Sequence, residues 1–152
     1  MSIILTDAGA VAILGKYFKN VQVANTLALD AATSYQLRLF KSNSTPTDTD
    51  TADGYTPVDA NENGSGYAHA TLSIANATIS VVNNIAQVTY PQINFTFAAP
   101  LLANATVYGY YVLDAAGTLI YAERANTSFT PVSPGDAILI TPIFQMSKGT
   151  PT

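Results

Sequence analysis

The chain has 152 residues, no cysteine and a low content of charged side chains, since Asp, Glu, Lys and Arg together make up 11% of it. An average soluble domain carries roughly 25% of such residues, so the polar surface must come mainly from Thr, Ser and Asn. The net charge of −4 and the scattered Lys and Arg residues argue against nucleic acid as a partner, and the lack of cysteine excludes disulfides and thiolate metal sites.

The N-terminal segment predicts an arm with one short helix and no targeting signal. The apolar run Ile3–Leu5 is too short for the hydrophobic core of a signal peptide. No stretch of the chain approaches the ~20 apolar residues of a membrane span, so we expect no membrane partner. Within Thr6–Lys19, Leu14 and Phe18 recur at helical spacing. We therefore expect an arm over residues 1–20 that contains this helix.

From residue 35 onward, apolar and polar side chains alternate, which predicts antiparallel strands with one buried face. The alternating segments are Tyr67–Ala75, Ile79–Val81, Val88–Tyr90 and Ile93–Phe97. Asn83-Asn84 predicts a tight hairpin, because Asn tolerates positive φ. About seven or eight such strands, separated by turn signals, predict a jelly-roll-like antiparallel β-sandwich that forms a single domain over residues 21–152.

Two later segments, Val107–Leu113 and Ala137–Phe144, are apolar on both faces. Such a strand is either central in a sandwich or has one face against another subunit. The turn Asp114–Gly117 predicts a hairpin that joins the first of these segments to Thr118–Arg124.

The segment Ser42–Gly66 is rich in Thr, Asp, Asn, Gly and Pro and predicts a long polar loop that is either functional or mobile. Four of its carboxylates are crowded together: Asp48, Asp50, Asp53 and Asp59. Calcium favours such oxygen-rich loops. The spacing departs from a known calcium loop, because Ala52 stands where a further acid is expected, so we favour a solvated loop and keep calcium as an alternative.

Catalytic chemistry has few candidates in this sequence. His69 is the single histidine, and without cysteine a nucleophile, a base and an orienting group are hard to assemble. Asp114, Glu123 and Asp136 are possible paired carboxylates. However, Asp114 and Asp136 stand at turns, where Asp usually stabilises the backbone. We therefore expect a protein without enzymatic activity, bound metal or cofactor.

Tyrosines gather in the later strands at Tyr108, Tyr110, Tyr111 and Tyr121. Their apolar rings and polar hydroxyls suit protein interfaces and sugar-stacking surfaces. Ordinary core filling explains the same cluster equally well, and the sequence leaves both readings open.

Several segments, taken in order, resemble a set of small proteins common in environmental tailed-phage genomes. The segments are Leu5–Gly9, Leu37–Pro46, Gly66–Ala68, Val107–Arg124 and Ser133–Pro142. The resemblance implies a structural protein of the virion, made in the bacterial cytoplasm and carried on the capsid surface. Within that class we expect a capsid cement or decoration protein.

A cement protein binds itself, here as a homotrimer, and the major capsid protein. The residues expected at these interfaces are Leu14, Phe18, Tyr55, Tyr67, Tyr108, Tyr110, Ile138 and Ile140. The alternative is a tail-fibre or adaptor domain that binds bacterial surface glycans through tyrosine faces and the Asp/Asn-rich loop.

Overall fold

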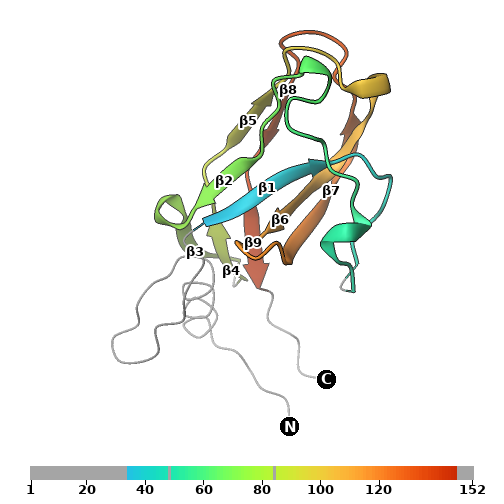
Figure 1. Ribbon diagram of the computed structural model, residues 1–152. Coiled ribbons are helices and arrows are strands. Elements are labelled where there is room, and N and C mark those ends of the chain that lie inside the picture. The colour runs from blue at the N-terminus through green and yellow to red at the C-terminus, as the bar shows by residue number, and fades with distance from the viewer. Residues whose placement is uncertain (1–33, 48, 84, 147–152) are drawn as a thin grey trace. The chain divides into compact units, whose positions relative to one another are not determined.

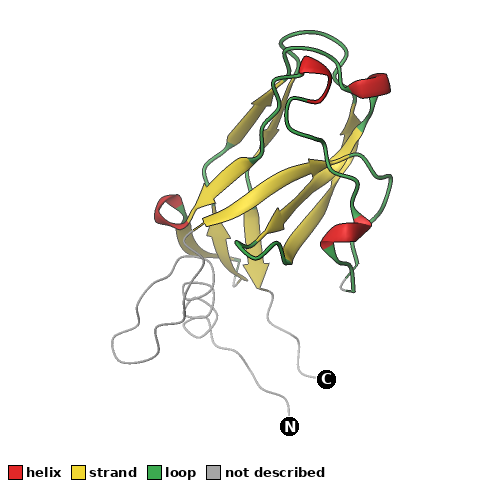
Figure 2. Cartoon of the chain, in the orientation of Figure 1, coloured by secondary structure: helices red, strands yellow, loops and turns green. Residues whose placement is uncertain are grey.

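The structure, a computed structural model, describes residues 34–47, 49–83 and 85–146. Strands dominate this part, and its helices are single 3-10 turns (Figures 1 and 2). The prediction of an all-β, antiparallel protein is therefore confirmed. The helix expected over Thr6–Lys19, with Leu14 and Phe18, lies outside the described residues. In the described part no helix is long and apolar enough to cross a membrane.

The strands form three sheets. The strands are β1 Ser34–Phe40, β2 Ala70–Ser73, β3 Thr78–Val82, β4 Ile85–Thr89, β5 Ile93–Thr96, β6 Val107–Leu113, β7 Leu119–Phe129, β8 Ala137–Ile140 and β9 Ile143–Met146. One sheet has the order β2-β1-β6-β7, a second has the order β3-β4-β9, and β5 pairs with β8. Internal contacts group the chain into two compact units, which we name after their central strands. The prediction of one domain over residues 21–152 is not tested by this grouping and stays a prediction.

The β4 unit contains residues 73–92 and 141–146 of the described part. Its β3–β4 hairpin has the register Val82↔Ile85, and Asn83 has the positive φ of 51° that this tight turn demands. The predicted hairpin is therefore confirmed. The buried residue Val88 lies at the centre of the sheet, and the ring of Tyr90 meets that of Phe144 edge to face.

One predicted strand is wrong. The segment Ala137–Phe144 does not form one strand but divides into β8 and β9, which belong to different sheets. Pro142 explains the break, because proline has no N–H to donate to a sheet ladder. Its carbonyl oxygen instead accepts a hydrogen bond of 3.0 Å from the Tyr90 N–H.

The β6 unit contains residues 34–72 and 93–140 of the described part. β6 lies between β1 and β7 in its sheet (Figure 1). All its residues except Tyr108 are buried, so the strand is covered on both faces, as its two-sided apolar pattern predicts. The β1–β6 register places Phe40 opposite Gly109 and Leu37 opposite Val112.

The long loop Ser42–Gly66 folds back along the end of β1. The Lys41 N–H donates to the Thr56 carbonyl at 2.7 Å, and the Val58 N–H donates to the Leu39 carbonyl at 2.9 Å. Tyr55 reaches from the loop into the core cluster formed by Phe40, Tyr111 and Leu113. The loop thus supplies part of the core, although the regular structure of its described residues is limited to the 3-10 turns Ala52–Gly54 and Glu62–Gly64 and a bridge from Pro57 to Phe40.

The β6–β7 ladder contains two bulges. Ile120 is an extra residue between the pairs Leu113↔Leu119 and Val112↔Tyr121. Farther along, residues 125–128 of β7 lie opposite Tyr108 alone, and all of them are exposed. Because bulges disrupt a regular ladder, they protect an edge strand such as β7 from pairing with other chains.

Gly109→Ala should destabilise the β6 unit strongly. A Cβ atom at this position would lie 2.1 Å from the Glu123 carbonyl oxygen and 2.7 Å from the Phe40 ring. We expect the free energy of unfolding, measured by chemical denaturation, to fall by about 3 kcal/mol. Gly54→Ala is the matched control, because its Cβ meets no atom within 4 Å. Equal stability of the two variants would contradict the described β6–β7 packing.

Candidate functional site

The structure places most of the tyrosines expected at an interface inside the β6 unit. Tyr55 and Tyr67 are each 3% exposed, and Tyr110 is 7% exposed. Their side chains therefore offer little surface to a partner, and core filling accounts for them. Tyr108 is half-buried, as are Ile138 and Ile140 on β8. The interface prediction itself is not tested, and Leu14 and Phe18 lie outside the described residues.

Two tyrosines share one carboxylate on the edge of the sheet. The Tyr110 hydroxyl donates to Glu123 Oε2 at 2.6 Å, and the Tyr121 hydroxyl lies 3.3 Å from the same oxygen. Burial and the neighbouring Glu123 charge raise the pKa of Tyr110, so this hydroxyl stays protonated and acts as a donor. This cluster fixes side chains across β6 and β7.

Arg124 ties the long loop to β7. Its guanidinium donates to the Ser44 carbonyl at 2.9 Å and to Asn43 Oδ1 at 2.7 Å. It also lies over the Tyr108 ring, with Cζ 5.2 Å from the ring centroid. Glu123 and Arg124 thus contact different parts of the unit, as their opposite positions on one strand predict.

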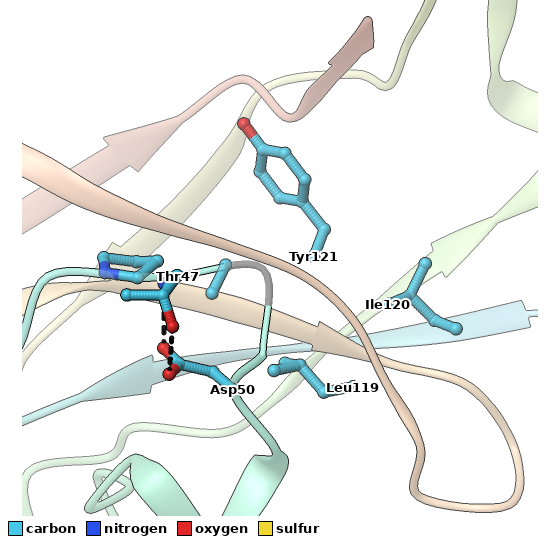
Figure 3. Close-up of a pocket in the computed structure, with 7 residues that line it drawn as sticks. Thr47, Asp50, Leu119, Ile120 and Tyr121 are labelled. Carbon is cyan, nitrogen blue, oxygen red and sulfur yellow. Dashed lines mark hydrogen bonds between the residues drawn. The ribbon is translucent and has the colours of Figure 1, made fainter. Parts of the chain in front are cut away.

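A shallow hollow of about 350 Å³ lies between the long loop and β7 (Figure 3). Its lining comprises Pro46, Thr47, Asp50, Leu119, Ile120, Tyr121 and Ala122. On the loop side, Asp50 Oδ1 accepts a bond of 2.6 Å from the Thr47 hydroxyl, and Oδ2 accepts one of 2.6 Å from the Tyr55 hydroxyl. These bonds, that from Thr47 above all, hold the pKa of Asp50 below its usual range. The Tyr121 side chain points away from Thr47 and Asp50 (Figure 3).

Glu62 is the one acidic residue among the described residues that is buried, and it holds three segments together. Oε2 accepts bonds from Lys41 Nζ at 2.6 Å and from the Asp59 N–H at 3.2 Å. Oε1 accepts a bond of 3.1 Å from the Leu102 N–H. Burial alone would raise the pKa of Glu62. The hydrogen bonds from Lys41 and the two N–H groups, together with the Lys41 charge, have the larger combined effect and lower this pKa below its usual value. The carboxylate therefore stays charged and braces the loops.

The other carboxylates considered for catalysis stabilise turns. Asp114 Oδ1 accepts bonds from the N–H groups of Ala116 and Thr118. Asp136 Oδ2 accepts bonds from the N–H groups of Val132 and Ser133. The predicted turn role of both residues is confirmed.

His69 stands just before β2, beside the Tyr67 ring. Burial, followed by the Arg38 charge, lowers its pKa, so it is neutral at pH 7. Within the described residues, no group of three or more His, Asp or Glu side chains is placed to hold a metal ion. Asp48 lies outside the described residues, and calcium binding by the long loop stays untested.

The Lys41–Glu62 pair was not predicted from the sequence. The two residues lie 21 positions apart, and both sit among loop residues without periodicity. The sequence nevertheless contained one signal for Glu62. Charged residues are scarce in this chain, and this one stands in a Gly/Asn-rich turn.

A comparison of the chain with protein-family models, curated proteins and solved structures finds no match. The geometry of the described residues therefore has to support any assignment of function.

Replacing Glu62 should show how much the brace contributes to stability. We expect Glu62→Gln to lower the free energy of unfolding at pH 7 by about 2 kcal/mol, since Lys41 and two N–H groups lose their anionic partner. Because the folded pKa is depressed, this stabilisation is present above the carboxyl range and is lost as the pH falls through it. The variant should therefore lose stability less steeply than the native protein on acidification.

Asp53→Asn is the matched control, because Asp53 is exposed on a 3-10 turn. Denaturation curves from about pH 7 to about pH 3 give both quantities. If Glu62→Gln and Asp53→Asn matched each other in stability and pH dependence, the brace would have no energetic role.

Proposed function

We propose that the chain is a non-enzymatic structural protein of a bacteriophage virion, a cement or decoration protein that stabilises the head. It acts as a homo-oligomer, a homotrimer in the simplest case, on the outer lattice of the major capsid protein. It is made in the host bacterial cytoplasm and resides on the capsid surface. The proposal includes a jelly-roll-like β-sandwich with one short N-terminal helix as its fold.

The proposal rests above all on one observation: the charged side chains of the β6 unit hold its loops and strands in place. Five carboxylates accept hydrogen bonds that fix loops or strands: Asp50, Glu62, Asp114, Glu123 and Asp136. Arg124 and Lys41 likewise hold loop segments. These groups stiffen the protein and are not gathered around a reacting centre, which suits mechanical support.

The low charge content also suits attachment to a shell. Contacts formed by apolar burial and uncharged hydrogen bonds are weakened little by salt, whereas exposed ion pairs are screened. In addition, when the copies in an oligomer each bind the lattice weakly, multivalency makes the binding of the whole oligomer strong. The resemblance of several segments to tailed-phage proteins points to the same class.

Co-sedimentation with empty capsid shells of the parent virus tests the proposal. We expect the protein to pellet with shells at a stoichiometry fixed by the lattice, with less than about a threefold change in affinity between about 50 mM and about 500 mM NaCl. Sedimentation velocity should show a homo-oligomer in solution. A monomer that stays in the supernatant at every salt concentration would contradict the proposal.

A second candidate is a tail-fibre or adaptor domain that binds bacterial surface glycans. The hollow between the long loop and β7 favours it, because the lining of this volume of about 350 Å³ includes polar Thr47 and Asp50 as well as apolar Leu119 and Ile120. Small-ligand sites combine such apolar walls with a few polar groups.

NMR titration with millimolar monosaccharides of bacterial surface glycans distinguishes the two candidates. Glycan binding predicts saturable shifts of the Thr47, Asp50 and Leu119 amide signals. Those shifts should vanish in Asp50→Asn and persist in Asp59→Asn, which alters an exposed carboxylate outside the hollow. A cement protein should show no saturable shift.

A further inference from the structure

Asn63 and Gly64 form the only Asn-Gly pair in the sequence, and they lie in the 3-10 turn Glu62–Gly64. An asparagine followed by glycine is prone to spontaneous deamidation, because glycine has no side chain to hinder its own backbone nitrogen. Both residues are exposed to solvent. A Cβ atom built on Gly64 would meet no atom within 4 Å, so its surroundings are open. The turn therefore contains the groups that this covalent modification requires.

Deamidation joins the Gly64 nitrogen to the side chain of Asn63. The nitrogen bonds to Asn63 Cγ, the Cγ–Nδ2 bond breaks, and ammonia leaves with the proton of the Gly64 amide. Water then opens the resulting cyclic imide at either of its two carbonyl carbons. The product at position 63 is an aspartate or an isoaspartate, and water is the single co-reactant.

The backbone of the folded turn prevents this ring closure. Asn63 has a φ of 52° and a ψ of 29°, and this ψ directs the Gly64 nitrogen to the side opposite the Asn63 Cβ atom. The nitrogen cannot reach Cγ until this bond rotates. The Gly64 N–H also donates to the Asn61 carbonyl at 3.0 Å, and the rotation breaks that bond. Opening of the turn must therefore precede the reaction.

Hydrogen bonds to a neighbouring loop oppose this opening. The turn Glu62–Gly64 lies beside the turn Leu102–Asn104 at one end of the β6 unit (Figure 1). Asn63 Nδ2 donates to the Pro100 carbonyl at 3.0 Å, and Glu62 Oε1 accepts the bond of 3.1 Å from the Leu102 N–H. Two consecutive side chains thus fasten the reactive turn to one loop. Because Glu62 is buried, its bonds are shielded from water and contribute more than exposed ones.

We propose that Asn63 is a site of spontaneous deamidation and that the Glu62 carboxylate controls its rate by holding the turn closed. The product places a carboxylate against the Pro100 carbonyl oxygen. Neither group has a proton to donate, so the link between the two loops is lost. The modification is irreversible and leaves these loops less tightly held than before. This inference does not depend on the proposed function.

The rate of deamidation in Glu62→Gln tests the inference. The native protein and the variant are incubated in mildly alkaline buffer made with heavy-oxygen water, and peptide mapping by mass spectrometry follows position 63. We expect the native protein to react at least about tenfold more slowly than a synthetic peptide of residues 59–66. Glu62→Gln should react at least about fivefold faster than the native protein, because the turn opens more often. In the deamidated fraction, the Leu102 amide should exchange its hydrogen faster than in the intact fraction.

Asp53→Asn provides a matched reference site in the same molecule. It creates a second Asn-Gly pair on the exposed 3-10 turn Ala52–Gly54, which the Glu62 carboxylate does not contact. The rate at position 53 should agree within about twofold with and without Glu62→Gln, because that change opens one turn and not the whole unit.

Three results would overturn the inference. The first is an equal rate at position 63 in the native protein and Glu62→Gln, and the second is a native rate as fast as that of the peptide. The third is an equal acceleration at positions 53 and 63, which would mean that Glu62→Gln acts by general unfolding. Lys41→Met carries the same test if Glu62→Gln does not fold, because it removes the cation that donates to Glu62 Oε2.

Discussion

Three segments of the β6 unit meet at one buried carboxylate, that of Glu62. Glu62 accepts hydrogen bonds from Lys41, which follows β1, and from the backbone of two loops at Asp59 and Leu102. A buried charge is costly unless its partners satisfy it, and here one cation and two N–H groups do so. These partners offset the cost of burying the charge, and the same carboxylate orders loops that have little regular secondary structure.

Strand pairing provides the frame on which these loops are held. β6 is buried along nearly its whole length between β1 and β7, and Gly109 lets the Phe40 ring and the β7 backbone approach it closely. The long loop then covers one part of this sheet through Tyr55 and Arg124. Rigid loops on a tightly paired sheet suit the proposed role, in which the protein gives mechanical support and contacts other proteins.

Much of the strand content was predictable from the sequence, because alternation is a local signal. The bounds of Val107–Leu113 are those of β6, and Asn83 marked the β3–β4 turn. The break at Pro142 was missed because the apolar pattern continues across it. The Glu62 brace was out of reach for a different reason: its partners at positions 41 and 102 are brought together only by the tertiary fold.

Native-state hydrogen exchange of the Leu102 amide tests the brace most directly. If Glu62 holds this N–H, its exchange should be at least about 100-fold slower than in an unstructured peptide and should become fast in Glu62→Gln, while the Val112 amide in β6 remains protected. Exchange of the Leu102 amide at the unstructured rate in the native protein would contradict a loop surface that is ordered by the Glu62 carboxylate.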